Sequence, residues 1–484
     1  MEKQATKIHA ALLASPGIGH LVPVLELGKR LVAQLDFQVT IFVVGAEASV
    51  LESQLQSFPN PNIFNVVSLP PVDISGLVDP NTSIVTKIIV MMRETIPSLR
   101  SEIFSLKLRP TVLIVDLFGT EALPLADEFN MLKYVLIASN AWFLAATIYF
   151  PTVDGKEEDE HMLQQKPLMI SGCKPVRYED TLEAFLDKND ELYAEYLRIG
   201  LEIPTADGIL VNTWEDLEAE TLASLRDDKL LGRVTRLPIY TIGPLVREMK
   251  SPDLESPVLN WLDKQPAESV IYVSFGSGGT LSAKQIAELA WGLELSKQRF
   301  IWVIRPPVEN DVTAAYFSVG KESDGTPNYL PEGFLTRNSK LGLVIPDWAP
   351  QAEILRHPSV GGILSHCGWN STTESIVNGV PMVAWPLYAE QKMNATMLTE
   401  DIGVAIRSKK LPCERTVERK EIEMLVRGVM VEKEGDKIRS RVKELKSSAE
   451  KALSRGGSSY NSLSRVAEDC EKSLQGLVEK AYGA

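Results

Sequence analysis

The residues best suited to bind a phosphorylated ligand are gathered between positions 348 and 391. In the middle of this stretch an apolar run ends in His-Cys-Gly-Trp-Asn-Ser at 366–371, and a helix can follow. A strand, a glycine-bearing turn and a helix start bind phosphate well, because free backbone N–H groups and the positive end of the helix dipole point at the anion. Asn370 and Ser371 add side-chain donors. His366 can add a hydrogen bond or a positive charge, so we expect a diphosphate here.

The flanks of the same stretch carry side chains that suit the rest of a nucleotide sugar. Trp348 offers a flat apolar face for a base, and Gln351 and Glu374 can bind ribose hydroxyls. Glu390 and Gln391 follow a predicted strand and a loop, where they can hold the hydroxyls of a sugar. Any one of these residues alone would more often be structural. Because so many polar requirements coincide, the stretch predicts a nucleotide-sugar site.

A second candidate for chemistry is His20, which follows Ser-Pro-Gly-Ile-Gly at 15–19 directly beyond the first predicted strand. The turn is not a dinucleotide fingerprint, because Val22 stands where the third glycine should be. We therefore expect a free imidazole that faces the crevice of the first domain. His9 is predicted to be structural, and His161 and His357 to be surface residues.

Asp116 ends the apolar run 112–116 and so is expected at the carboxyl end of a parallel strand, in the same crevice. An equally good interpretation from sequence is that it caps the next helix. If Asp116 reaches His20, it fixes the tautomer and stabilises the imidazolium. The other ring nitrogen is then free to take a proton as a general base.

The stretch 348–391 closely resembles the plant secondary-product glycosyltransferase signature, the donor-site box of family 1 UDP-glycosyltransferases. It departs mildly at Ile363, Ser365 and Glu390, where an aromatic residue, Thr and Asp are commoner. The resemblance spans essentially the whole chain. Gly-Ser-Gly-Gly-Thr-Leu-Ser at 276–282 and Tyr-Ala-Glu-Gln-Lys-Met-Asn-Ala at 388–395 make it most similar to the group that glucosylates phenols such as hydroquinone, monolignols and coumarins.

This resemblance implies an inverting transfer of glucose from UDP-glucose to the hydroxyl of a small phenolic acceptor, which gives a β-D-glucoside. His20 would be the general base and Asp116 its partner, and Gln391 is associated in the family with glucose donors. The alternative left open is a catalytically silent UDP-sugar-binding protein.

Motif and resemblance together define two sets of expected contacts. The predicted donor-binding residues are Ser277, Trp348, Ala349, Gln351, His366, Trp369, Asn370, Ser371, Glu374, Glu390, Gln391 and Asn140. The predicted acceptor-binding residues are Gly17, Phe118, Trp142, Phe143, Tyr193, Leu197 and Ala389, although most of the apolar ones could equally be core.

Composition limits the classes of ligand and partner that this protein can be expected to bind. The net charge of −14 argues against nucleic acid or an anionic membrane as the main partner. The four cysteines form no CxxC pair, which favours reduced thiols over a zinc or disulfide framework. The chain has no Asp-x-Asp, so we expect no metal and no cofactor beyond UDP-glucose as co-substrate. With no signal or membrane span expected, a cytoplasmic monomer is predicted.

Apolar strand-like runs alternate with amphipathic helical stretches, which predicts an α/β protein with parallel sheets. The predicted strands are 8–14, 39–44, 112–116, 134–137 and 208–211, then 270–275, 300–304, 343–345, 362–364 and 382–384. We expect two doubly wound Rossmann-like domains facing a cleft, which the resemblance identifies as the GT-B fold. The predicted parts are an acceptor-binding domain at 1–246, a linker at 247–257, a donor-binding domain at 258–460 and a returning helix at 461–484. Residues 141–150 are predicted as a buried helix and 154–161 as an acidic loop.

Overall fold

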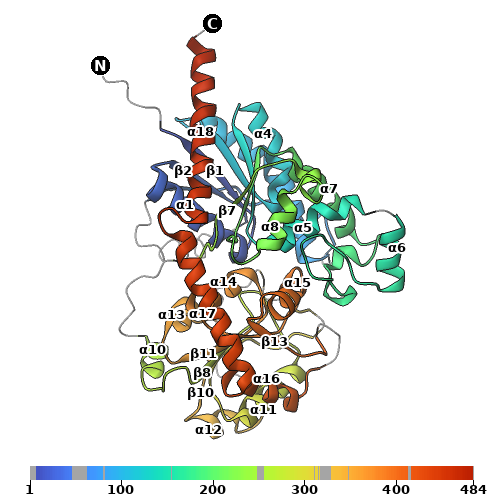
Figure 1. Ribbon diagram of the computed structural model, residues 1–484, viewed down its shortest axis with the longest axis vertical. Coiled ribbons are helices and arrows are strands. Elements are labelled where there is room, and N and C mark those ends of the chain that lie inside the picture. Colours follow the sequence, from blue (N-terminus) through green and yellow to red (C-terminus); the bar gives the residue numbers. More distant parts are fainter. Residues whose placement is uncertain are drawn as a thin grey trace.

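A computed structural model gives the structure of this chain. It describes residues 7–45, 63–79, 82–153, 155–247, 256–309, 311–313, 316, 329–346, 348–411 and 416–482. Within these ranges the chain forms two parallel β-sheets, one in each half of the sequence, with helices packed on them (Figure 1). The predicted α/β class is confirmed.

The first sheet has seven strands in the order β3-β2-β1-β4-β5-β6-β7. Its strands are β1 (His9–Ala14), β2 (Gln38–Val43), β3 (Asn65–Ser68), β4 (Val112–Asp116), β5 (Leu132–Ile137), β6 (Gly208–Val211) and β7 (Ile239–Thr241). The helices of this half are α1 (Ile18–Leu35), α3 (Ile84–Ser105), α4 (Leu123–Glu128), α5 (Ala141–Tyr149), α6 (Gly155–Gln164), α7 (Glu191–Glu202), α8 (Ala219–Arg226) and α9 (Gly232–Thr235).

The second sheet has six strands in the order β10-β9-β8-β11-β12-β13. Its strands are β8 (Val270–Ser274), β9 (Arg299–Ile304), β10 (Gly342–Pro346), β11 (Val360–Ser365), β12 (Met382–Ala384) and β13 (Ala405–Arg407). The helices of this half are α10 (Pro257–Leu262), α11 (Ala283–Ser296), α12 (Phe334–Asn338), α13 (Gln351–Arg356), α14 (Trp369–Asn378), α15 (Gln391–Thr396), α16 (Arg419–Met430), α17 (Lys433–Leu453) and α18 (Ser458–Tyr482).

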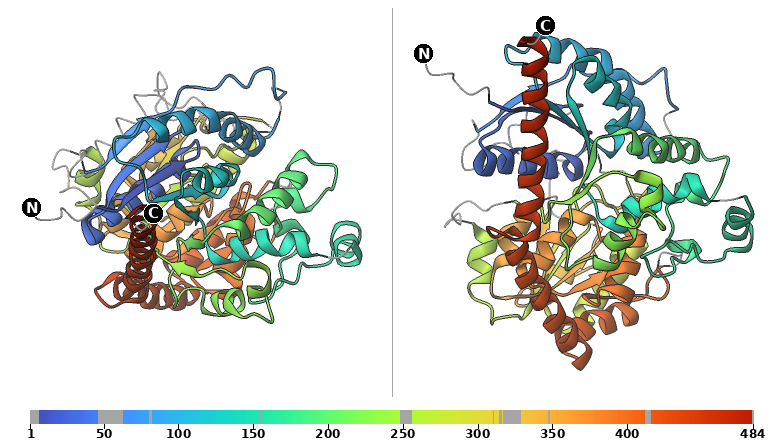
Figure 2. Two further views of the ribbon diagram at one scale, coloured as in Figure 1. Left: turned by 90° about the horizontal axis from the view of Figure 1, so that it is seen from above. Right: turned by 45° about the horizontal axis from the view of Figure 1, so that its top comes forward.

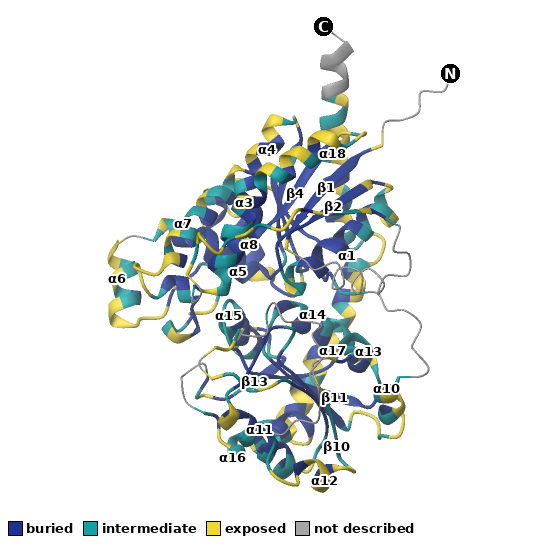
Figure 3. Ribbon diagram, turned by 180° about the vertical axis from the view of Figure 1, so that it is seen from behind, coloured by how far each residue is buried: buried dark blue, intermediate teal, exposed yellow. Residues whose placement is uncertain are grey.

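The strands form where Val, Ile and Leu follow one another without a polar alternation, which is typical of parallel strands covered on both faces. All residues of β1, β4 and β8 are buried. Figure 3 shows both sheets as buried layers between helices whose outer faces are exposed. Several helices begin at a side chain that accepts a backbone N–H, as Ser83 does before α3 and Ser282 before α11.

All ten predicted strands are confirmed within one or two residues, but three strands were missed. These three, β3, β7 and β13, all lie at sheet edges and have only three or four residues each. A strand at a sheet edge pairs with one neighbouring strand instead of two, so its apolar run can be shorter than that of a central strand. Such a short run is harder to recognise in the sequence.

One local prediction was wrong. The acidic loop expected at 154–161 is a helix from residue 155 onward. It forms most of α6, whose first turn carries Glu157 and Glu158 at the positive end of the helix dipole. His161 is therefore not a surface residue. It is buried, and its ring nitrogens contact Lys166 O and Thr181 Oγ1 at 2.7 and 3.2 Å. The buried helix predicted at 141–150 is confirmed as α5.

The last helix returns to the first half of the chain. Figures 1 and 2 show α18 crossing from the second sheet to run beside the first. The hydroxyl of Tyr240 on β7 donates to Asp469 of α18 at 2.5 Å, and Ser459 donates to Gly243 O at 2.6 Å. The two sheets lie on either side of the predicted linker, most of which (248–255) falls outside the described residues. The exact domain limits stay predictions.

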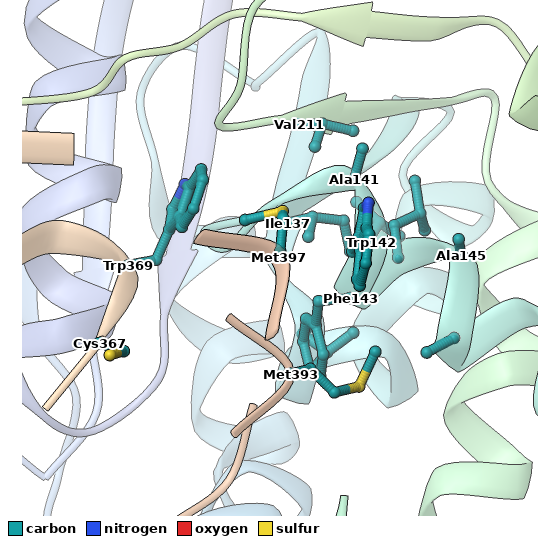
Figure 4. Close-up of a cluster of buried hydrophobic side chains, with 14 of the residues drawn as sticks. Ile137, Ala141, Trp142, Phe143, Ala145, Val211, Cys367, Trp369, Met393 and Met397 are labelled. Atoms are coloured by element: carbon teal, nitrogen blue, oxygen red, sulfur yellow. The ribbon is translucent and has the colours of Figure 1, made fainter. Parts of the chain in front are cut away.

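The two halves also share apolar packing. One continuous cluster of buried side chains includes residues of both halves, such as Phe143 on α5 and Met393 on α15 (Figure 4). None of the described helices combines the length and the apolarity that crossing a bilayer requires.

Candidate active site

His20 and Asp116 come together at the carboxyl ends of β1 and β4. His20 lies in the first turn of α1, and its Nδ1 is 3.2 Å from Asp116 Oδ2. The contact has the distance of an ion pair but not the alignment of a hydrogen bond, and such pairs often align only when substrate binds. The His20 side chain is 22% exposed and Asp116 is fully buried, so the imidazole can meet a ligand while the carboxylate cannot.

The alternative role of Asp116 as a helix cap is not what the structure shows. Asp116 precedes the short helix η1 (Leu117–Ala122), but its side chain makes no capping hydrogen bond. Its oxygens accept instead from the backbone N–H and the hydroxyl of Ser15. The ring of Phe118, a predicted acceptor contact, lies against the His20 imidazole, with 5.2 Å between ring centroids.

The predicted phosphate turn is formed as expected by β11, residues 366–368 and the start of α14. The His366 imidazole packs against Gly276 and Gly368 so closely that a Cβ on either glycine would collide with its Nε2. Burial, together with the positive charge of Arg305, lowers the pKa of His366 to about 4. The imidazole is therefore neutral at physiological pH. Of the two roles that the sequence left open, the structure favours a hydrogen bond donated to a phosphate over a positive charge.

The residues predicted to bind ribose form one hydrogen-bonded group. The Gln351 amide at the start of α13 donates to Ser371 Oγ at 2.9 Å and to Glu374 Oε2 at 2.7 Å. Burial raises the pKa of Glu374, while the hydrogen bond from Gln351 opposes that shift. Asn370 on the same turn of α14 donates to Gly19 O at 3.1 Å, so this helix start touches the residue that precedes His20.

Trp348 is 59% exposed, which leaves its indole open to a base as predicted from sequence. Ala349 beside it is buried, and Ser277 lies half-buried in the glycine loop after β8. The roles of these three residues in nucleotide binding stay predictions.

Glu390 and Gln391 lie at the start of α15. Burial raises the pKa of Glu390, and the electrostatic interaction with His20 is among the effects that lower it. The two side chains therefore interact electrostatically although they belong to different halves of the chain. Gln391 is only 4% exposed, and its Oε1 accepts the backbone N–H groups of Leu387 and Tyr388 at 3.0 and 3.2 Å. Ala389 has a left-handed φ of 52°, which forms part of this tight turn.

Three predicted contact residues are buried and have other partners, while their predicted ligand contacts stay predictions. Trp369, predicted to bind the donor, is 3% exposed and donates its Nε1–H to Asn212 O at 2.7 Å. Trp142, predicted for the acceptor, is 1% exposed within the shared apolar cluster (Figure 4). Asn140, also predicted for the donor, is fully buried and caps α5, where its Oδ1 accepts from Phe143 N. These residues pack between the two halves, bond across them or cap a helix. The sequence alone does not distinguish such structural roles from contact with a ligand.

The other residues predicted to bind the acceptor differ in burial and in their contacts. Phe143 is buried in the same apolar cluster. Leu197 of α7 is partly buried and packs against that cluster. The Tyr193 hydroxyl donates to Glu158, and its ring meets Phe150 edge-on. Gly17 has φ 105°, and a Cβ there would collide with the Tyr316 ring.

Tyr316 and Arg305 are site residues that the sequence did not reveal. The Tyr316 hydroxyl donates to Pro16 O at 3.2 Å, so a residue of the second half rests on the turn that precedes His20. Arg305 follows β9 directly and donates to Gly276 O at 2.5 Å in the glycine loop. Its place at the carboxyl end of a parallel strand was the available signal. Among the described residues, no group of three or more His, Cys, Asp or Glu side chains could hold a metal ion.

Comparison with known proteins agrees with this geometry. A family model described as UDP-glucoronosyl and UDP-glucosyl transferase matches residues 237–428. UDP-glycosyltransferase 72E1 of Arabidopsis thaliana is 55% identical to this chain over 99% of both sequences. The chain belongs to the UDP-glycosyltransferase family. Anthocyanidin 3-O-glucosyltransferase 5 of Manihot esculenta is likewise 55% identical, over 97% of this chain and 96% of that protein.

Solved structures show the same fold for this glycosyltransferase. TcCGT1 in complex with UDP is 46% identical and superposes with a TM-score of 0.90, covering 96% of this chain and all of that one. Phytolacca americana UGT2, complexed with UDP-2-fluoro-glucose and pterostilbene, is 36% identical with a TM-score of 0.84 over 96% of this chain and all of that one. The predicted GT-B architecture and the predicted enzyme class are confirmed.

Proposed function

We propose that this glycosyltransferase moves glucose from UDP-glucose to the hydroxyl of a small phenolic acceptor and inverts the anomeric centre. The observation that carries the proposal is the hydrogen bond from Asn370 to Gly19 O. It sets the phosphate turn beside the start of α1, where His20 is partly exposed and Asp116 lies behind it. A general base and a diphosphate site at one point are what direct displacement at a sugar carbon requires.

In the proposed reaction, Nε2 of His20 removes the proton from the acceptor hydroxyl. Asp116 stabilises the imidazolium from the Nδ1 side. The acceptor oxygen attacks the anomeric carbon of UDP-α-glucose from the face opposite UDP, so the new C–O bond forms as the bond to the diphosphate breaks. The products are a β-glucoside, UDP and a proton that His20 releases to solvent.

Charge on the departing diphosphate is met by donors that are already in place. The first turn of α14 presents backbone N–H groups and the positive end of its dipole. Ser371 and Asn370 add side-chain donors, and neutral His366 adds an N–H. Arg305 beside the glycine loop supplies positive potential without requiring His366 to be charged.

The sugar and the acceptor are supported by the relatives and by one residue. Hydroquinone glucosyltransferase of Rauvolfia serpentina is 42% identical over 95% of this chain and 97% of that protein, and hydroquinone is a phenol. The resemblance of the donor box associates Gln391 with glucose. The partly exposed imidazole of His20 lies against the Phe118 ring, which adds apolar surface beside it for an aromatic acceptor.

The test is UDP release from UDP-glucose with and without a panel of phenols, with products identified by mass and β-linkage. We expect release only when a phenol is present. His20→Ala should lose transfer by at least about a hundredfold and still bind UDP, because the residues predicted to bind UDP lie in the second half of the chain. Release without an acceptor, or no release with any phenol, would overturn the proposal, and UDP-glucose binding without turnover would identify a silent binding protein.

A further inference from the structure

Helix α15 begins at Gln391, directly after Glu390, yet its side chains bind the other half of the protein. Lys392 pairs with Glu183 at 2.5 Å. Asn394 accepts a hydrogen bond from Asn140 at 2.6 Å. The helix that carries the proposed sugar-binding pair is therefore held from outside its own domain.

The third α15 contact is made by Thr396, which donates to Asp180 Oδ2 at 2.9 Å. Asp180 is fully buried in the segment between α6 and α7. Arg407 on β13 donates to both of its oxygens, at 3.0 and 2.9 Å, and Arg177 Nε donates at 2.7 Å. A buried carboxylate with charged donors on both oxygens has one orientation, because any other leaves a charge unpaired.

The Asn140–Asn394 pair extends to the phosphate turn. Asn394 donates its own N–H to Cys367 O at 2.9 Å, and both asparagines are buried. Since Asn140 also caps α5, one chain of hydrogen bonds runs from α5 through α15 to the turn beside His366.

Apolar contacts support the same attachment. Met393 of α15 and Met397, the next residue after that helix, belong to the buried cluster that contains Trp142 and Phe143 of α5. Figure 4 shows both methionine side chains among those of the first domain. By contrast, the residues predicted to hold the nucleotide lie on α13, on α14, in the segments that precede these helices and in the glycine loop after β8.

We infer that Asp180 and Asn140 are positioning residues that place the Glu390–Gln391 turn through α15, so that the acceptor domain controls how the donor's sugar is held. Both side chains are fully buried, so we assign them an effect through α15. The inference rests on the proposed function only in taking the Glu390–Gln391 turn as the part that binds the sugar. Asp180 separates recognition of the sugar from recognition of UDP, because its contacts reach α15 and β13 and not the phosphate turn. The Asn140–Asn394 pair, by contrast, also reaches that turn through Cys367 O.

Thr396→Val tests this with the smallest change, since it removes only the hydroxyl that binds Asp180. We expect the affinity for UDP, measured by calorimetry, to stay within twofold of wild type. We expect the KM for UDP-glucose to rise at least fivefold, with the KM for the phenol little changed. Thr396→Ser restores the hydroxyl and should return the KM for UDP-glucose towards wild type. Asp180→Asn should raise the KM for UDP-glucose more than Thr396→Val does.

Glu288→Gln is the matched control, because it breaks a bidentate pair with Arg419 that lies wholly within the second half. It should lower the melting temperature without changing the ratio of UDP-glucose to UDP affinity. An unchanged KM for UDP-glucose in folded Thr396→Val, equal weakening of UDP and UDP-glucose, or the same shift in Glu288→Gln would overturn the inference. If wild type transfers no glucose to phenols, the proposed function fails instead, and the two affinities still test this inference by binding alone.

Discussion

Ser15 holds both oxygens of Asp116. Its backbone N–H donates to Oδ2 at 3.0 Å and its hydroxyl donates to Oδ1 at 2.5 Å, and both side chains are buried. Ser15 follows β1 and Asp116 ends β4, and these two strands are neighbours in the sheet. The pairing of β1 with β4 therefore fixes the carboxylate that faces His20.

Ser15→Ala should lower kcat for glucosyl transfer about tenfold, because a hydrogen bond to a charged group contributes roughly 1.5–3 kcal/mol and part of it is expressed in the transition state. Ser15→Thr keeps the hydroxyl and should lose much less. Steady-state kinetics with a thermal melt of each variant check this. A normal kcat in a folded Ser15→Ala protein would show that the backbone N–H alone orients Asp116.

His366 should act without charge. Its pKa is lowered from 6.5 to about 4 in the folded protein, so between these pH values the unfolded chain binds the extra proton and folded stability falls as the pH falls. His366→Gln, which keeps a neutral donor, should retain UDP affinity within a few fold, whereas His366→Ala should lose about tenfold. Denaturation followed at several pH values should show a flatter acid limb in the glutamine variant. An NMR titration of His366 near 6.5 would contradict the argument.

Gln391→His should weaken the use of UDP-glucose. The Gln391 oxygen accepts two backbone N–H groups of its own turn, and an imidazole cannot accept both, so the turn that presents Glu390 should shift. Losing hydrogen bonds of about 1 kcal/mol each predicts a rise in the KM for UDP-glucose of about tenfold. Gln391→Glu keeps the accepting oxygen and serves as the control. Identical donor kinetics in Gln391→His would count against a sugar-holding role.

Glu218 should make stability depend on pH in the opposite direction to His366. It accepts the N–H groups of Ala141 and Trp142 at the start of α5, and burial raises its pKa to about 7. Because the folded protein keeps the proton between pH 4.5 and about 7 while the unfolded chain has lost it, the free energy of unfolding falls as the pH rises, by at most on the order of 3 kcal/mol. Glu218→Gln should remove this slope, as chemical denaturation across that range would show. The exposed neighbour variant Glu220→Gln should keep it.

The sequence predicted local structure well wherever one stretch of chain held the whole signal. The buried strands β4, β6 and β12 have the predicted limits, because uninterrupted apolar runs bounded by polar residues admit little else. The phosphate turn is also local: strand, glycine and helix start follow one another in the chain. Helix α6 was missed because its charged composition resembles that of a solvated loop, and nothing local marks His161 as buried.

Contacts between the two halves of the chain could not be predicted from the sequence. Trp142 and Trp369 are predicted ligand contacts, and the structure shows that both are buried and that Trp369 donates a hydrogen bond to Asn212 across the two halves. Asn140 and Asn394 are 254 positions apart, and no local pattern pairs two such amides. Tyr316 reaches Pro16 in the same way.

The sequence by itself determined the fold class, the diphosphate turn and the two candidates for proton transfer, since each depends on residues adjacent in the chain. Only the tertiary structure decided that Asp116 faces His20 rather than capping a helix, that His366 is neutral, and that α15 is held by residues of the first half of the chain. Those properties depend on burial and on partners supplied by distant strands and helices, and burial is set only when the two sheets and their helices pack together.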